Sequence, residues 1–128
     1  MIYLDTSVAL AHLLGETRCP DAGLWQSPLI ASRLLEYELW TRLNARALGA
    51  SHGEDARELL AMVALVELSP PVLARALEPF PVVVRTLDAL HLATLLFVQG
   101  EGSKLRLATY DERLAEAAGG VGVMRWEG

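Results

Sequence analysis

Short apolar runs alternate along the chain with longer segments whose apolar residues recur at helical spacing. The short runs are bounded by polar or turn-forming residues, which is typical of buried strands. This pattern predicts strands at 1–5, 28–32, 66–71, 104–110 and 121–126. The helical spacing predicts helices at 7–15, 33–49, 51–65, 71–80, 87–100 and 111–120, with a short helical turn at 21–26.

Capping residues mark several of the predicted helix boundaries. Ser7 and Ser32 are expected as N-caps, and Gly15 and Gly49 as the ends of the helices that follow them. Strands that are separated by helices pair in parallel, with the connecting helices covering the sheet. We therefore expect an α/β protein, a three-layer α/β/α sandwich with a central parallel sheet. The length favours one domain over residues 1–128.

Composition narrows the class of protein. Hydrophobic residues make up 52% of the chain and charged residues 21%, which suits a folded domain with a sizeable core. Three histidines and a single cysteine, Cys19, leave no room for a disulfide framework or a cysteine zinc site. This cysteine usage favours a reducing, cytoplasmic setting. Neither a signal peptide nor a membrane span fits the sequence. The net charge of −5 argues against a simple basic nucleic-acid binder.

Four acidic residues lie where a parallel α/β sheet binds its ligands. Asp5 ends the first predicted strand, Asp111 follows the strand at 104–110, Asp88 begins a helix, and Glu38 lies in the helix after the second strand. In open α/β sheets, ligands gather beyond the carboxyl ends of the strands. The four acids, although far apart in the sequence, could therefore meet at one edge of the sheet.

Asp5 and Glu38 each have an ordinary structural alternative. Asp5 could simply begin a turn, although a carboxylate that ends an apolar strand and precedes two hydroxyls is informative. Glu38 could be an ordinary solvated acid on a helix surface. It projects, however, between Leu34 and Leu35 on a helix face shared with Ala45, where a solvated acid is unexpected.

Asp88 and Asp111 have stronger alternatives. Thr86 could cap the helix that contains Asp88, and an acid in the first turn of a helix is favourable by about 0.3–1 kcal/mol. Thr109 and Glu112 have the spacing of a capping box around Asp111. The case for a site depends on the four acids together.

Four stretches of the sequence also resemble a known family. In order, they are YLDTSVAL at 3–10, ASRLLEYELWTRL at 31–43, RTLDALHLATLL at 85–96 and LATYDERLAEAA at 107–118. Together they resemble the PIN-domain ribonucleases, specifically the VapC-type toxins of toxin–antitoxin pairs. The resemblance implies that the catalytic, metal-binding acids are Asp5, Glu38, Asp88 and Asp111. It also implies supporting hydroxyls at Thr6 and Thr109.

The implied activity is hydrolysis of RNA with the help of divalent cations. Mg²⁺ and Mn²⁺ prefer carboxylate and water oxygens, and they assist phosphodiester hydrolysis. We expect Asp5 as the central ligand, Asp88 and Asp111 as further ligands, and Glu38 as a ligand of a second ion or as the group that orients water. The resemblance implies products with a 5′-phosphate and a 3′-hydroxyl. Without metal, a pair of acids about 6 Å apart would repel by roughly 2–3 kcal/mol.

Other polar residues have two interpretations each. Four arginines could hold RNA phosphates or could form ordinary salt bridges; they are Arg33, Arg42, Arg46 and Arg85. His91 could touch the substrate, but a hydrogen-bonded structural histidine is the more common case.

The resemblance further implies an antitoxin partner and a homodimer. Trp25, Tyr37 and Trp40 could stack on bases or receive a partner's helix, or could simply pack in the core. We expect Leu13, Trp25 and Trp40 in an antitoxin groove.

A nuclease toxin has four alternatives. A haloacid-dehalogenase-type phosphatase needs a second aspartate two residues after the first, where this chain has Ser7. No phosphate-binding glycine motif follows the first strand, which disfavours a nucleotide-binding module. A catalytically silent PIN-fold binding protein and a housekeeping RNA-processing nuclease stay as alternatives.

Overall fold

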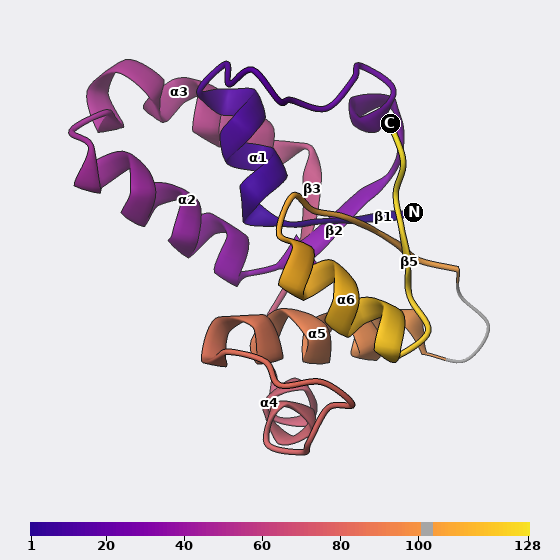
Figure 1. Ribbon diagram of the computed structural model, residues 1–128. Helices are drawn as coiled ribbons and strands as arrows, with labels where there is room; N and C mark the ends of the chain where they lie inside the picture. Colours follow the sequence, from indigo (N-terminus) through magenta and orange to yellow (C-terminus); the bar gives the residue numbers. More distant parts are fainter. Residues whose placement is uncertain (101–103) are drawn as a thin grey trace.

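The centre of the molecule is a parallel five-stranded sheet in the order β3–β2–β1–β4–β5 (Figure 1). The computed structural model describes residues 1–100 and 104–128. Its strands are β1 (Ile2–Leu4), β2 (Leu29–Ser32), β3 (Val63–Val66), β4 (Arg106–Ala108) and β5 (Met124–Arg125). The middle strand β1 pairs with β2 on one side and β4 on the other, so it is covered on both edges.

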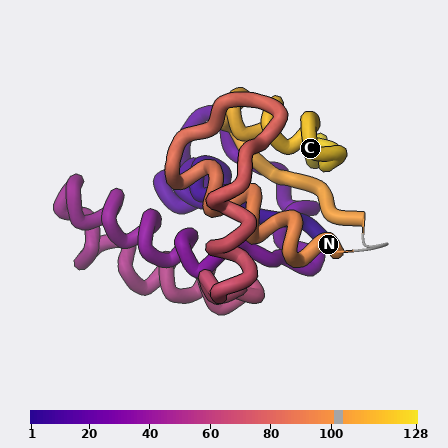
Figure 2. The backbone as a smooth tube through the Cα atoms, turned by 90° about the horizontal axis from the view of Figure 1, so that it is seen from below, coloured from indigo at the N-terminus to yellow at the C-terminus, as the bar shows by residue number. Residues whose placement is uncertain are grey.

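Helices cover both faces of this sheet, as the three-layer prediction required (Figures 1 and 2). They are α1 (Thr6–Leu13), α2 (Leu34–Ala45), α3 (Gly49–Ala61), α4 (Pro70–Ala76), α5 (Thr86–Gln99) and α6 (Glu112–Gly120), with a short 3-10 helix, η1, at Leu24–Gln26. Helices α1, α2 and α3 pack on one face, α5 and α6 pack on the other, and α4 lies against α5. The predicted fold class is therefore confirmed.

Alternation of side chains along β1 divides the core into two layers. Ile2 and Leu4 point toward α1, α2 and α3, whereas Tyr3 points toward α5 and α6. Each fully buried leucine or valine contributes roughly 1.5–3 kcal/mol through removal of its surface from water. Since both faces of β1 are buried, the strand holds its last residue, and the acid that follows it, in a fixed place.

The boundary between α2 and α3 differs from the prediction. Gly49 was expected to end one long helix, but α2 ends at Ala45 and Gly49 is the first residue of α3. The turn is made by Ala47, whose φ of 55° is left-handed, and the Leu48 amide donates to the Leu43 carbonyl. This is the usual left-handed helix ending with alanine in the place of glycine, so the sequence carried no glycine signal for it.

The third strand also differs from the prediction. The sequence pattern continued a helix to residue 65 and placed the strand at 66–71, but α3 ends at Ala61 and β3 begins at Val63. Residues of β3 pair in register with Leu29–Ser32 of β2, and this tertiary pairing overrides the helical spacing. The helix predicted at 71–80 ends earlier, at Ala76. No helix in the described ranges is long and apolar enough to cross a membrane.

Candidate active site

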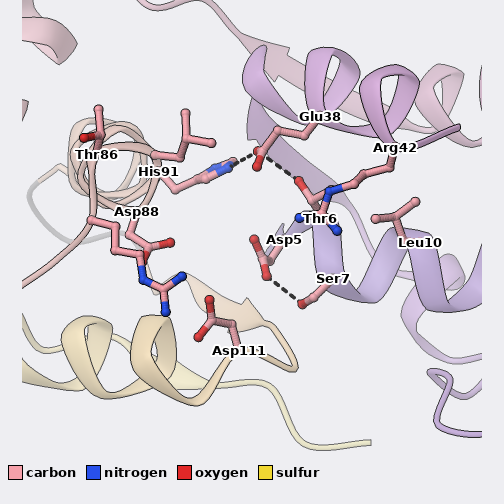
Figure 3. A pocket seen from close by; sticks show the side chains of 12 residues that line it. Asp5, Thr6, Ser7, Leu10, Glu38, Arg42, Thr86, Asp88, His91 and Asp111 are labelled. Carbon is pink, nitrogen blue, oxygen red and sulfur yellow. Dashed lines mark hydrogen bonds and ion pairs between the residues drawn. The ribbon is translucent and has the colours of Figure 1, made fainter. Parts of the chain in front are cut away.

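A pocket of about 400 Å³ lies beyond the carboxyl ends of β1 and β4 (Figure 3). All four acids singled out in the sequence line it: Asp5, Glu38, Asp88 and Asp111. They come from the end of β1, from α2, from α5 and from the residue before α6, and their carboxylates point toward the same hollow (Figure 3). The fold therefore brings together four acids that are spread over more than a hundred residues of sequence.

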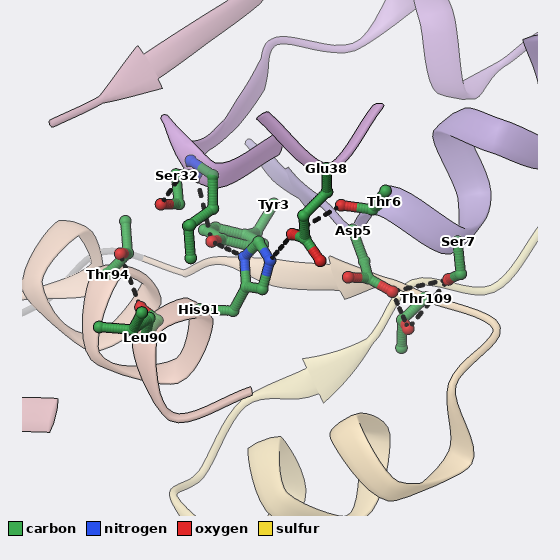
Figure 4. A network of polar contacts seen from close by, with 11 residues as sticks. Tyr3, Asp5, Thr6, Ser7, Ser32, Glu38, Leu90, His91, Thr94 and Thr109 are labelled. Atoms are coloured by element: carbon green, nitrogen blue, oxygen red, sulfur yellow. Dashed lines mark hydrogen bonds and ion pairs between the residues drawn. The ribbon is translucent and has the colours of Figure 1, made fainter. Parts of the chain in front are cut away.

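Asp5 is the most buried of the four acids, with 6% of its surface exposed. It occupies the N-cap position of α1, where Ser7 was expected, but its carboxylate does not cap the helix. Instead, one oxygen, Oδ2, accepts hydrogen bonds from Ser7 Oγ at 2.6 Å and from Thr109 Oγ1 at 2.7 Å (Figure 4). Two hydroxyl donors therefore compensate for the burial of this carboxylate.

Both hydroxyls are oriented by the backbone of the loop after β4. Ser7 Oγ accepts from the Tyr110 amide at 2.9 Å, and Thr109 Oγ1 accepts from the Asp111 amide at 3.0 Å. Each hydroxyl hydrogen is thus left to point at Asp5. Within the described chain, the other oxygen of Asp5, Oδ1, accepts no hydrogen bond and stays open to the pocket.

Glu38 repeats this arrangement on the opposite wall. Its Oε1 oxygen accepts from Thr6 Oγ1 at 3.1 Å and contacts His91 Nε2 at 2.6 Å (Figure 4). Burial alone would raise the pKa of Glu38, but the hydrogen bonds and charge of its neighbours, His91 first, outweigh burial and lower the pKa. Glu38 is therefore held as a carboxylate, on the pocket side of α2.

His91 is a buried histidine with hydrogen-bond partners on both ring nitrogens, as expected for a structural histidine. It is 2% exposed, and its Nδ1 lies 2.8 Å from the Tyr3 hydroxyl, which also accepts from the Ser32 amide at 3.2 Å. Burial alone would lower the pKa of His91, but the Glu38 carboxylate outweighs burial and raises it. Burial raises the pKa of Tyr3 far above its ordinary value, so this phenol stays protonated.

Asp111 and Asp88 form the more open side of the pocket. Asp111 is the N-cap of α6, since its Oδ1 accepts from the amides of Arg113 and Leu114 at 2.9 and 3.3 Å. The capping box expected from Thr109 and Glu112 does not form, because Thr109 donates to Asp5 instead.

Asp88 lies half-buried in the first turn of α5, and Thr86 does not cap that helix, whose N-cap is Arg85. Its carboxylate receives no hydrogen bond from any part of the chain that the structure describes. Burial raises the pKa of Asp88, and the nearby charges of Asp111 and Asp5 raise it further. Asp88 therefore lies near the acids Asp5 and Asp111 and, within the described residues, has no hydrogen-bond donor to stabilise its charge.

The donor set fits a hard divalent cation in its chemistry. Carboxylate oxygens line one pocket, and Asp5 and Glu38 each keep one oxygen without a protein donor in the described ranges. In their present positions, however, no three acidic, imidazole or thiol side chains in those ranges lie close enough to hold an ion together. Binding an ion between them would therefore require these acidic side chains to move closer together.

The four candidate arginines divide into two groups. Arg42 and Arg85 line the pocket beside the acids. Arg33 lies outside it, with Nε donating to Glu67 at 2.8 Å, and Arg46 lies at the end of α2 without lining the pocket. Arg42 and Arg85 are therefore the two candidate arginines whose positive charge lies beside the acids.

The aromatic candidates pack mostly on the core. Trp25 packs against His12 with the rings tilted at 45° and a centroid distance of 4.4 Å, and the guanidinium of Arg57 lies 5.2 Å from the Trp40 ring. Both tryptophans are partly buried against α1, α2 and α3, as is Leu13. Tyr37 is exposed on α2 beside Trp40.

Sequence reasoning missed the roles of three residues in this site. Ser7 was interpreted as a helix cap, Tyr3 as one more strand residue, and the partners of His91 were not identified. The one available signal was the composition of the first strand, in which Tyr3 is the only side chain with a polar atom before Asp5.

Comparison with known proteins identifies the family of this chain. The PIN domain family model matches residues 2–120. Ribonuclease VapC47 from Mycobacterium tuberculosis (strain CDC 1551 / Oshkosh) is 31% identical, and Ribonuclease VapC46 from Mycobacterium tuberculosis (strain ATCC 25618 / H37Rv) is 33% identical. Each match covers 95% of this chain and 93% of the relative.

A solved structure has the same fold. It is described as a toxin-antitoxin complex from Klebsiella pneumoniae, and it superposes with a TM-score of 0.69 at 16% identity, over 95% of this chain and 93% of that one. The chain therefore belongs to the PIN-domain family, among its VapC ribonucleases.

Proposed function

We propose that this protein is a divalent-metal-dependent endoribonuclease that acts as the toxin of a toxin–antitoxin pair, through one PIN domain over residues 1–128. The observation that carries the proposal is the single pocket lined by Asp5, Glu38, Asp88 and Asp111. Relatives named as VapC ribonucleases, aligned over almost the whole chain, support the same activity.

Each of the four acids has a role in the proposed reaction. Asp5 would be the central ligand of a magnesium or manganese ion, and Asp88 and Asp111 would complete the set of protein ligands. When bound, such an ion polarises the phosphate and lowers the pKa of a coordinated water. Glu38, held through Oε1, would use its free Oε2 to orient the attacking water or to bind a second ion.

The substrate and partners follow from the charge of the pocket and from the relatives. Arg42 and Arg85 would pair with RNA phosphates on either side of the bond that is cut. An antitoxin would keep the enzyme inactive in the cytoplasm until it is needed. We also propose that the protein forms a homodimer, as the family resemblance implies.

The proposal is tested by incubating purified protein with a labelled RNA, with and without Mg²⁺ or Mn²⁺. We expect cleavage only with metal, and products with a 5′-phosphate and a 3′-hydroxyl. Asp5→Asn should lower the rate by about 10³-fold, because the loss of several kcal/mol of transition-state stabilisation at a metal site has that effect. The matched control is Asp55→Asn, which makes the same change at an exposed aspartate on α3 and should cleave RNA at the wild-type rate.

Three outcomes would contradict the proposal. Products with a 2′,3′-cyclic phosphate would exclude attack by a metal-bound water. Cleavage that persists in Asp5→Asn would assign the activity to a contaminant or to a different site. RNA binding without cleavage at any metal concentration would instead favour the catalytically silent binding protein.

A further inference from the structure

Two buried polar residues, Tyr3 and His91, link the two faces of the sheet behind the pocket. Tyr3 points from β1 into the layer of α5 and α6 and is 0% exposed, and His91 comes from α5. Glu38 belongs to α2, on the opposite face. His91 therefore connects an acid on one face to a tyrosine that is buried in the other (Figure 4).

The hydrogen bonds of His91 leave its ring a single orientation. Nε2 lies 2.6 Å from a carboxylate oxygen, which has no proton to give, so Nε2 carries a hydrogen and donates it to Glu38. At the other end of the ring, Nδ1 lies 2.8 Å from the Tyr3 hydroxyl. A half-turn of the ring would replace both nitrogens with carbon atoms and would break both contacts.

The tyrosine is itself held by the backbone. Its hydroxyl accepts the Ser32 amide at 3.2 Å, at the point where β2 ends. The hydrogen bonds thus run from the Ser32 amide through Tyr3 and His91 to the Oε1 oxygen of Glu38. Because the acceptor at the end of this chain is a carboxylate oxygen, His91 Nε2 carries a hydrogen whether or not His91 Nδ1 also carries one.

We propose that His91 is a positioning residue for the nuclease site: held by Tyr3, it fixes the Glu38 carboxylate so that Oε2 faces the pocket. This inference rests on the proposed function. Thr6 donates to the same Oε1 oxygen at 3.1 Å, so both donors restrain one oxygen and leave the other free. Residues that orient a metal ligand from behind typically change metal affinity or activity by about 10–100-fold when they are replaced.

The test compares His91→Leu, His91→Gln and Tyr3→Phe, with Leu95→Val as a control. Leucine removes the donor to Glu38, whereas glutamine keeps an N–H group in reach of it. Tyr3→Phe leaves His91 in place but removes the hydroxyl that holds its ring. Leu95 is buried on α5 and has no polar contact, so its truncation reproduces a general loss of core packing.

The first measurement is the binding of Mn²⁺ alone, by calorimetry, with the melting temperature recorded for each variant. We expect about 10–100-fold weaker Mn²⁺ binding for His91→Leu, an intermediate loss for Tyr3→Phe, and recovery of most of the affinity in His91→Gln. Leu95→Val should bind Mn²⁺ as the wild type does, even at a lower melting temperature.

A second measurement needs no metal. The ¹⁵N spectrum of the imidazoles in the metal-free protein should contain a protonated, slowly exchanging Nε2 that disappears in His91→Leu and exchanges faster in Tyr3→Phe. This spectroscopic signature reports the hydrogen bond itself, and a change in global stability alone does not move it, as Leu95→Val will demonstrate.

The outcomes separate this inference from the proposed function. If the wild type binds Mn²⁺ and cleaves RNA, and folded His91→Leu does both equally well, the positioning role is wrong while the nuclease stands. If His91→Leu does not fold, Tyr3→Phe decides: wild-type affinity and exchange in that variant overturn the inference. If the wild type binds no Mn²⁺, the proposed function fails and the inference fails with it.

Discussion

The two sides of the acidic pocket are held in different ways. On one side, Asp5 and Glu38 each have one oxygen that accepts two side-chain hydrogen bonds. On the other side, among the residues that the structure describes, the Asp111 carboxylate accepts only from backbone amides of its own helix, and Asp88 has no donor. The first pair is fixed by the tertiary fold, and the second pair is positioned by the starts of two helices.

This difference indicates which part of the site exists before a ligand binds. The lowered pKa of Glu38 means that the fold stabilises its charge, whereas the raised pKa of Asp88 means that the fold disfavours its charge. A cation bound in the pocket would compensate for the burial of Asp88 and its repulsion by Asp111 and Asp5. In this account, Asp5 and Glu38 form a rigid side that is already in position. Asp88 and Asp111 form an open side that would move toward a bound ion.

Among variants that keep all four acids, the largest expected effect comes from removing a support of Asp5. Thr109→Val keeps the shape of a buried side chain but removes the donor to Asp5 and the acceptor of the Asp111 amide. We expect about a 10–100-fold loss of cleavage rate, although every acid is still present. Leu107→Val, in the core of β4, controls for lost packing, and rates measured under identical conditions check the prediction. Full activity in Thr109→Val would mean that Asp5 needs no such support.

Metal should stabilise the protein through the open side. A cation present at about ten times its dissociation constant adds about 1.4 kcal/mol, which raises the melting temperature of a chain of this size by about 4–6 °C. Thermal unfolding in EDTA, Mg²⁺ and Mn²⁺ measures this shift, which should disappear in Asp5→Asn. A melting temperature indifferent to millimolar metal would argue against the site.

Neutralising one acid from each side should change metal-free stability in opposite directions. Glu38→Gln should lower the free energy of unfolding by about 1 kcal/mol, the difference between a charged and a neutral hydrogen-bond acceptor. Because the pKa of Glu38 is lowered by folding, this contribution is present above its unfolded pKa and is lost as the pH falls through the folded value.

Asp88→Asn should instead raise the free energy of unfolding by a few tenths of a kcal/mol in EDTA, since solvent screens a half-exposed acid. Denaturant unfolding of both variants at neutral pH makes the comparison, with Asp55→Asn as the exposed control. Changes of the same sign in Glu38→Gln and Asp88→Asn would remove the distinction between the two sides.

The smallest effect concerns the arginines. Arg85→Ala should weaken binding of a short RNA by about threefold to tenfold and should reduce the salt dependence by about 0.7 in log–log slope, the value for one phosphate contact on a single strand. Arg33→Ala should change neither quantity, because Arg33 is bound to Glu67 outside the pocket. Binding is measured in EDTA to prevent cleavage. Equal losses in the two variants would contradict a specific role for Arg85.

The layers of the fold and the meeting of the four acids in one pocket were predictable from the sequence, for a physical reason. An apolar strand that ends in Asp5 must place a carboxylate at the sheet edge, and parallel strands bring such ends together. The restraints on these acids were not predictable in the same way. The partner of Thr109 is Asp5, more than a hundred residues away, and local spacing instead favoured a capping box with Glu112.

Two boundary errors have the same origin. Ala47 ends α2 in a left-handed conformation that alanine rarely adopts, and β3 forms at residues with helical spacing because β2 offers a pairing edge. In both places, tertiary structure determines where the element begins or ends, and the local sequence pattern contains no signal for it.

Anomalous diffraction from a crystal soaked in Mn²⁺ tests the central claim most directly. We predict a manganese peak in the pocket within bonding distance of Asp5, with the carboxylates of Asp88 and Asp111 turned toward it. A fully soaked crystal in which those carboxylates stay apart, with no anomalous density between them, would contradict the claim that these acids form one metal site.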